Sequence, residues 1–232
     1  MIAIPVIAAD TIRDLVGGGQ TLSVSLRILA ILTILTILPS IILMTTSFVR
    51  VVIVLSFVRR ALGTQELPPN QIIIGLSLFL TFMIMAPTWS KIWNDAIQPY
   101  LDYQKGEAET IEAALKPARQ FMLRQVDRRD LDLFLKISNT EISSTGGIRL
   151  SDIPTSVVVC AFMTSELKRA FKMGFMIYLP FVVIDLVVAS VLISMGMLVL
   201  PPILISLPFK VLVFVLVDGW GLVVGKLAES FA

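Results

Sequence analysis

The chain has 232 residues, of which 56% are hydrophobic and only 16% charged, and its mean hydropathy is +0.88. Average soluble domains carry about 25% charged residues, so a soluble domain of this composition would expose much apolar surface. The net charge of +2 gives no electrostatic footprint for nucleic acid, which leaves lipid and protein as the expected partners. The single cysteine, Cys160, excludes an intramolecular disulfide, and the absence of histidine excludes Ser-His, Cys-His and His-zinc chemistry within this chain.

The chain begins with a segment, residues 1–21, that lacks the charged stretch and long apolar core of a secretory signal. We expect it to belong to the mature protein. Two apolar blocks follow, Ile28–Leu38 and Ile41–Val58, and Arg50 interrupts the second. Crossing a bilayer takes about 20 residues, so the two blocks together predict one long helical element, bent at Pro39 where the ring removes a backbone donor.

The stretch Gln71–Trp89 carries no charge and is the clearest membrane span in the sequence. With the blocks before it, it predicts a first helical hairpin over residues 22–89. Arg59 and Arg60 lie in the loop of this hairpin, and the positive-inside tendency places that loop in the cytoplasm, with the termini and the following insert outside. Three basic residues of the second hairpin weigh against this orientation: Lys168, Arg169 and Lys172.

Residues 90–156 form a charged insert in which acidic and basic side chains nearly balance, which predicts a small soluble, periplasmic helical domain. We expect Pro117 to begin its second helix, because proline is tolerated in a first turn. Asp127 or Asp130 is expected to cap a third helix by accepting free backbone donors. The run SNTEISSTGG, residues 138–147, predicts a loop.

Residues 157–232 predict a second hairpin. A short charged turn is expected around Glu166, followed by an apolar run, Met173–Leu200, that ends at Pro201. The last block, Ile203–Val217, is short for an independent span, so we expect it to pack against other protein.

Three charges lie inside apolar blocks: Arg50, Asp185 and Lys210. Each costs roughly 2.5–3.5 kcal/mol at the centre of a membrane helix, so each is expected to be paired or to face water. One interpretation is a structural ion pair, such as Asp185 with Lys210 across the proline turn. The other is that some of these charges line a conduit or a seam between subunits.

Soft apolar residues gather in a predicted loop near residues 195–202: Met195, Met197, Leu198 and Val199. Methionine adapts its shape easily, so a ring of such side chains from several subunits could seal a pore and still yield to a passing chain. Ordinary helix packing explains the same pattern.

The sequence offers little support for enzymatic chemistry. It contains no phosphate-binding Gly-x-x-x-x-Gly-Lys-[Ser/Thr] loop, and we expect no cofactor or metal. Asp185 is the one acidic residue inside an apolar block, so a two-aspartate intramembrane protease lacks its second carboxylate. A small-solute carrier remains open as an alternative to a channel subunit.

Long strings of the sequence resemble one known family. They are LPSIILMTTSFVRVVIVLSFVRRALGTQELPPNQIIIGLSLFLTFMIMAP, TSELKRAF, LPFVVIDLVVASVLISMGMLVLPP and LPFKVLVFVLVDGW. From about Leu38 to the C-terminus the chain thereby resembles the FliP family, the flagellar members of the group that includes the SctR subunits of injectisome type III secretion.

The resemblance implies an assembled function. Members of the family combine, typically as five copies with FliQ and FliR, into the gate through which unfolded flagellar proteins are exported. It also implies a place in the bacterial inner membrane at the flagellar basal body, with other export components as partners and much of the gate raised out of the bilayer plane. We expect the driving energy to come from a partner ATPase or the proton gradient. The expected fold is all-α: four long, transmembrane-like helical elements and a small extracytoplasmic insert, assembling as a helical oligomeric channel.

The resemblance also bears on single residues. The family carries a methionine-rich loop that narrows the pore like a gasket, and it matches Met197, Leu198 and Val199 here. Because this chain keeps only the first methionine, we expect a soft apolar seal rather than one built of thioethers alone. Five charged positions match the family pattern and are expected to serve assembly or gating: Arg50, Arg124, Glu166, Asp185 and Lys210.

Overall fold

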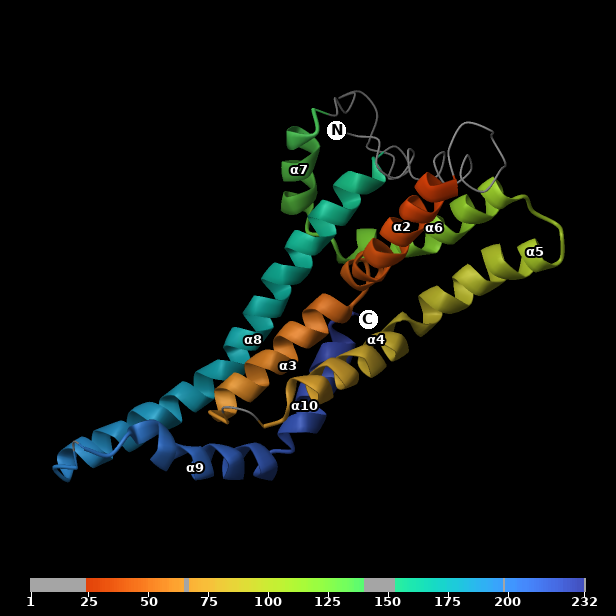
Figure 1. Cartoon of the computed structure of the whole chain (residues 1–232). Coiled ribbons are helices and arrows are strands. Elements are labelled where there is room, and N and C mark those ends of the chain that lie inside the picture. The colour runs from red at the N-terminus through yellow and green to blue at the C-terminus, as the bar shows by residue number, and fades with distance from the viewer. Residues whose placement is uncertain (1–23, 65–66, 140–152, 198, 232) are drawn as a thin grey trace.

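The computed structural model describes residues 24–64, 67–139, 153–197 and 199–231. Every regular element in these ranges is helical, which confirms the predicted all-α fold (Figure 1). In chain order the elements are α2 (Val24–Met44), α3 (Phe48–Leu62), α4 (Asn70–Ile92), the π-helical turn η1 (Trp93–Ile97), α5 (Gln98–Leu101), α6 (Glu107–Gln125), α7 (Arg128–Ile137), α8 (Thr155–Ser194), α9 (Pro202–Leu216) and α10 (Gly219–Glu229).

Helix α3 forms the centre of the core. It lies between α8 and α4 and packs against both (Figure 1). Its residues Val51, Val54 and Val58 are fully buried, and burying one such side chain stabilises the fold by roughly 1.5–3 kcal/mol. Gly174 lets α8 approach α3 closely, because a Cβ at this position would lie only 2.5 Å from the ring of Phe57.

Helix α8 is a single helix of 40 residues, so the expected charged turn around Glu166 is wrong. No glycine or proline occurs between Thr155 and Met173 to interrupt a helix. The charged residues instead lie on the helix, and two of them spaced three apart contact neighbouring elements: Glu166 bonds Arg50 of α3 and Arg169 bonds Gln125 of α6.

The first long element bends at a different place from the expected one. Helix α2 continues through Pro39, and the break of 68° falls between Met44 and Phe48. At this break the hydroxyl of Thr45 donates to the carbonyl of Ile41, and hydroxyls that bond backbone in this way compete with continued helix. A lone proline removes only one backbone donor, which a long helix tolerates here.

The insert is helical, as expected, but its helices do not divide at the predicted position. Pro117 lies buried inside α6 rather than at the start of a helix. The helix continues through it and packs against α4 and α8. Asp127 caps α7, as predicted, by accepting a hydrogen bond of 3.2 Å from the backbone N–H of Arg129. Most of the predicted loop at residues 138–147 falls outside the described residues.

Two stretches of the described chain are long and apolar enough to cross a membrane: Asn70–Leu101, which combines α4, η1 and α5, and Thr155–Ser194, which is α8. Two bent pairs, α2 with α3 and α9 with α10, raise the number to four if each pair counts as one span. This agrees with the four long elements predicted from the sequence.

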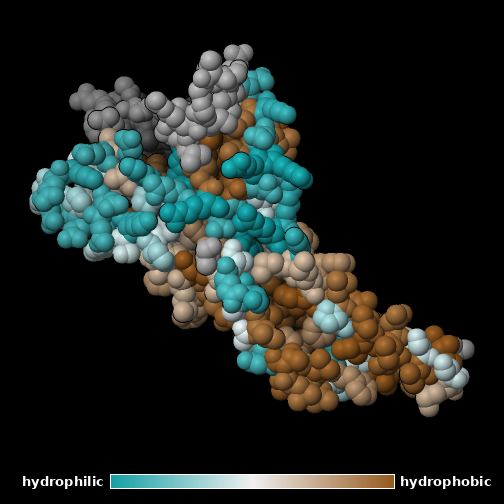
Figure 2. Space-filling view, turned by 180° about the vertical axis from the view of Figure 1, so that it is seen from behind, coloured by the Kyte–Doolittle hydropathy of each residue, from teal (hydrophilic) through white to brown (hydrophobic). Residues whose placement is uncertain are grey.

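The molecular surface has a hydrophilic end and a hydrophobic end (Figure 2). Helices α6 and α7 carry the hydrophilic part, whereas the second half of α8 and helix α9 carry the hydrophobic part. Large apolar side chains stand exposed there, for example Leu186, Leu204 and Leu216. Apolar patches of this extent mark surfaces that contact membrane or other protein.

Candidate functional site

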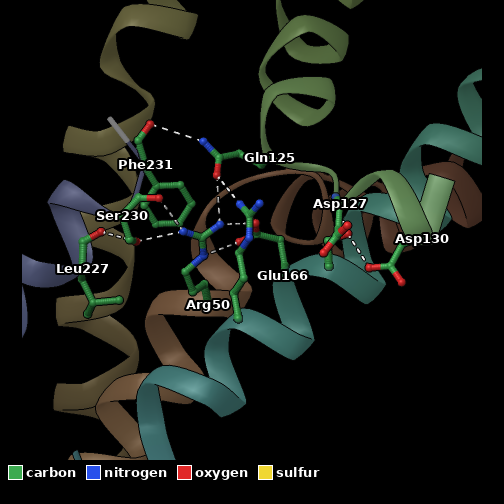
Figure 3. Close-up of polar contacts among 10 residues, drawn as sticks. Arg50, Gln125, Asp127, Asp130, Glu166, Leu227, Ser230 and Phe231 are labelled. Carbon is green, nitrogen blue, oxygen red and sulfur yellow. Dashed lines mark hydrogen bonds and ion pairs between the residues drawn. The ribbon is translucent and has the colours of Figure 1, made fainter. Parts of the chain in front are cut away.

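A buried polar cluster centres on Arg50 of α3 (Figure 3). Its Nε donates to Glu166 Oε2 at 2.8 Å, and its Nη2 donates to the other carboxylate oxygen, so the two side chains form a bidentate pair. Nη2 also donates to Gln125 Oε1 at 3.1 Å, and Nη1 donates to the carbonyl and hydroxyl oxygens of Ser230 at 2.9 and 2.8 Å. A guanidinium has five N–H donors, and this set of acceptors can engage all of them.

The end of the chain completes this arrangement. The ring of Phe231 lies 3.7 Å from the guanidinium carbon of Arg50, which is cation–π geometry. The amide nitrogen of Gln125 donates to the Phe231 carbonyl at 3.3 Å, and the same ring stacks on Phe121 of α6 at 6.3 Å. The Arg50 cluster, defined as Arg50, Gln125, Glu166, Ser230 and Phe231, therefore joins α3, α6, α8 and the end of the chain.

A second set of contacts ties the start of α7 to the same stretch of α8. The buried carboxylate of Asp130 accepts hydrogen bonds from Ser165, at 2.7 Å, and from Lys168. The backbone N–H of Asp127 donates to the Ser165 hydroxyl at 3.0 Å. Burial raises the pKa of the Asp130 carboxyl, but the bonds from Lys168 and Ser165 lower it by more, so that this pKa lies below its ordinary value.

These contacts explain what the string TSELKRAF does. Four of its side chains face partners on other elements: Ser165, Glu166, Lys168 and Arg169. They attach the insert and the end of the chain to α8. The sequence pointed to Arg50 and Glu166 as charged positions but not to each other, and it gave no sign of Gln125 or Ser230, because nothing local marks a neutral acceptor that serves a distant charge.

The ion pair expected between Asp185 and Lys210 is present. Lys210 Nζ of α9 lies 2.6 Å from Asp185 Oδ2 of α8, and the hydroxyl of Ser206 donates to the other carboxylate oxygen at 2.5 Å. The lysine side chain is 4% exposed and the aspartate side chain 29%. The pair joins α8 and α9 in the apolar half of the molecule, and each of its two charges is the partner of the other.

The tip loop, residues 195–201 between α8 and α9, holds the predicted gasket residues. Helix α8 ends in a Schellman motif, in which Gly196 takes a positive φ of 76° and Met197 N–H donates to the Leu192 carbonyl at 2.9 Å. Val199 is 95% exposed, Met195 66% and Met197 45%, whereas Leu198 lies outside the described residues. Within one chain these side chains cover no core.

Arg124 stands apart from these clusters. It is exposed on α6, directly before the buried Gln125 in the sequence, and its guanidinium has no hydrogen bond or ion pair with the described residues. The structure brings together Arg50 and Glu166, and separately Asp185 and Lys210, but it leaves Arg124 out of both groups.

Comparison with known sequences identifies the family. The sequence model of the FliP family matches residues 31–227, which is most of the chain. The chain belongs to the FliP family. The FliP match includes Arg50, Glu166 and the Asp185–Lys210 pair, whereas Ser230 and Phe231 lie just beyond it.

Several curated relatives carry the name flagellar biosynthetic protein FliP. The protein of Caulobacter vibrioides is 53% identical over 215 residues, which cover 93% of this chain and 79% of the relative. The protein of Bacillus subtilis is 49% identical over 212 residues, which cover 91% of this chain and 94% of the relative. That of Pectobacterium carotovorum is 49% identical over 219 residues, covering 94% and 83% respectively.

Proposed function

We propose that this chain is a subunit of the flagellar type III protein export gate, the passage through which unfolded flagellar proteins are exported during assembly. The observation that carries the proposal is the FliP family match over nearly the whole chain, with relatives named as flagellar biosynthetic proteins. The same match favours a gate subunit over a small-solute carrier. The chain acts as a structural component and is assigned no catalytic role.

The gate function requires several copies. We propose about five, joined with FliQ and FliR and with other components of the export apparatus. The exposed apolar surface of the second half of α8 and of α9 supports this, because a single chain leaves it uncovered and neighbouring subunits can bury it. Exported flagellar proteins would pass unfolded through the space that these subunits enclose.

The tip loop supplies the constriction in this proposal. Met195, Met197, Leu198 and Val199 from each copy form a soft apolar ring around the pore. Three of these side chains are exposed within one chain and so are free to meet their counterparts. Flexible apolar side chains exclude hydrated ions yet deform around a polypeptide, which is what a gate for unfolded protein needs.

The charged residues take separate roles. The Arg50–Glu166 and Asp185–Lys210 pairs fix the register of helices that must present the tip loop. Exposed Arg124 contacts a neighbouring subunit. We place the gate in the bacterial inner membrane at the flagellar basal body, with the insert, residues 90–156, in the periplasm, because the basic loop of Arg59 and Arg60 favours the cytoplasmic side.

The experiment replaces Met197, Leu198 and Val199 with glycine in the chain co-expressed with FliQ and FliR. Native mass of the complex in mild detergent measures assembly, and ion flux through the complex in vesicles measures sealing. We expect a complex of unchanged mass that leaks ions. The control is Tyr103→Gly, which removes an exposed side chain from another turn where φ is 57°, and it should not leak. Unchanged leakage in a correctly assembled triple variant would overturn the gasket, whereas a lone monomer or dimer that ignores the partners would overturn the gate itself.

A further inference from the structure

The insert carries charge of opposite sign at its two ends. At the end formed by η1, α5 and the first half of α6, residues 93–112 contain five acidic side chains and one lysine. At the other end, formed by α7 and the adjoining part of α8, the exposed charges are mostly basic: Arg128, Arg129, Lys136, Lys168 and Lys172, against Asp127 and Asp132. Helices α5 and α7 lie on opposite sides of the insert (Figure 1).

A groove lies at the acidic end between η1 and α6. Its volume is about 550 Å³, which is large enough to admit side chains of another protein, and its lining includes Asp95, Glu109 and Glu112. Lys105 and Lys116 also line it, and the Nζ of Lys105 donates to the backbone carbonyl of Asp95 at 2.8 Å. Within the described residues the three carboxylates form no hydrogen bond or ion pair. The acidic groove therefore has an excess of negative charge and unpaired carboxylates.

Arg128 and Arg129 occupy positions that a helix disfavours. They lie in the first turn of α7, where the end of the helix carries partial positive charge, so cations there are destabilising. Both are exposed and form no side-chain hydrogen bond or ion pair with the part of the chain that the structure describes. Asp127 caps the helix, and Asp130 is buried against Lys168. Local stability does not explain the two arginines, which favours a contact with another molecule.

Both features are held in place by packing within one chain. Helix α6 contacts η1 and α4, so the two sides of the acidic groove are fixed relative to each other. The first turn of α7 is fixed against α8 by the Asp130–Lys168 pair and by the hydrogen bond of 3.0 Å from the Asp127 N–H to the Ser165 hydroxyl. Groups that are already positioned lose little freedom on binding, so this arrangement favours association.

We propose that the acidic groove of one copy binds Arg128 and Arg129 of a second copy, so that the inserts of neighbouring copies join head to tail. The proposal rests on the proposed function, which requires several copies, and it names the surfaces through which the inserts meet. Guanidinium and carboxylate groups match in geometry, since they can form two parallel hydrogen bonds. A contact between two different surfaces generates a ring when its rotation closes. Because the two surfaces lie on opposite sides of the insert, each copy can bind one neighbour on either side.

The first test is crosslinking of the full chain, co-expressed with FliQ and FliR that lack cysteine. Cys160→Ser removes the native thiol, and Glu109→Cys with Arg129→Cys places one thiol at each proposed surface. A bifunctional maleimide should then yield a ladder of covalent dimers, trimers and larger species. Each single-cysteine variant should stay monomeric, and a mixture of the two should stop at dimers. The control is Glu109→Cys with Lys226→Cys, whose second thiol lies exposed on α10, and it should give no ladder.

A charge reversal gives a second measurement. Arg129→Glu should lower the share of chain in complexes of several copies about fivefold, because it places like charges together. Native mass in mild detergent measures this share. Adding Glu112→Arg should restore the share, since it returns opposite charges to the contact. The matched control adds Glu229→Arg instead, which restores the same net charge at an exposed site on α10 and should not rescue assembly.

The outcomes separate this contact from the gate function. A complex of several copies whose double-cysteine variant gives no ladder would overturn the head-to-tail contact and leave the gate intact. Covalent dimers alone would show a reciprocal contact between two copies instead. Equal rescue by Glu229→Arg and Glu112→Arg would reduce the effect to net charge. A wild-type chain that forms no complex of several copies would overturn the proposed function as well. Circular dichroism of each variant identifies a loss of assembly caused by unfolding.

Discussion

Arg50 of α3 and Glu166 of α8 form a bidentate ion pair with both side chains fully excluded from solvent. Burying two charges is expensive, and only good geometry with additional hydrogen bonds compensates for it. Here the additional bonds come from Gln125 and Ser230, on elements far along the chain. The pair is thus stable only when four separate parts of the fold are in place.

Glu166→Gln should destabilise the chain strongly. It leaves the Arg50 charge buried without a counter-charge, which typically costs about 3–5 kcal/mol. The measurement is thermal unfolding in detergent followed by circular dichroism. The control is Glu229→Gln, which removes a carboxylate from an exposed pair with Lys226 and should change stability by less than about 0.5 kcal/mol. Equal melting temperatures for the two variants would contradict this reading of the pair.

Phe231→Ala should loosen the end of the chain. The change removes a ring that stacks on Phe121 and covers the guanidinium of Arg50, and a desolvated cation–π contact is worth about 2 kcal/mol. Hydrogen exchange in α10 should accelerate while exchange in α4 stays the same. Phe231→Leu is the matched control, since it keeps an apolar side chain without a π face. If leucine protects α10 as well as phenylalanine does, the contact is only apolar packing.

The stability of the insert should depend on pH through Asp130. Because its folded pKa lies below the ordinary value of 3.8, the carboxylate stabilises the fold fully above that value and loses the contribution as the pH falls through it toward the folded pKa. Asp130→Asn should remove this acid sensitivity and lower stability by about 1 kcal/mol at neutral pH, since the charge-assisted bonds are lost. Melting temperatures from pH 3 to 7 measure both effects. Asp132→Asn, on the exposed face, should keep the wild-type slope below pH 4.

Much of the helical content follows from the sequence because block length and charge are local properties. The apolar blocks predicted the long elements, and Asp127 was a correct helix cap. The breaks were harder, since α2 continues through Pro39 and α6 through Pro117, so a proline alone does not mark the end of a helix. The charged stretch around Glu166 was misread as a turn because Glu166 is buried by a distant partner, Arg50, which no local pattern reveals.

The residues of the candidate site were also predictable from the sequence only in part. Asp185 and Lys210 were correctly paired from the sequence, because each needs a partner in an apolar block and they flank one turn. Gln125 and Ser230 could not be found, since each is a common surface residue whose role depends on where the chain folds it. The proposed contact of the tip loop with other copies involves a second chain, which no local pattern in one sequence describes.

Exchanging the charges of Asp185 and Lys210 tests whether their pairing or merely their presence matters. Asp185→Asn leaves Lys210, whose side chain is 4% exposed, without a counter-charge, and Lys210→Gln leaves the carboxylate with only Ser206. Each single variant should lower the stability of the complex by about 3 kcal/mol, reduced for Asp185 by its partial exposure. The exchange Asp185→Lys with Lys210→Asp restores opposite charges at the same two positions. It should therefore be about 1–3 kcal/mol more stable than the sum of the losses measured for Asp185→Lys alone and Lys210→Asp alone.

Melting temperature and swimming motility of bacteria that carry each variant as the sole copy provide the two readouts. Recovery of both would show that the ion pair itself holds α9 against α8 in the working gate. An exchange variant no better than that sum would show instead that Ser206 and the local packing require the original orientation.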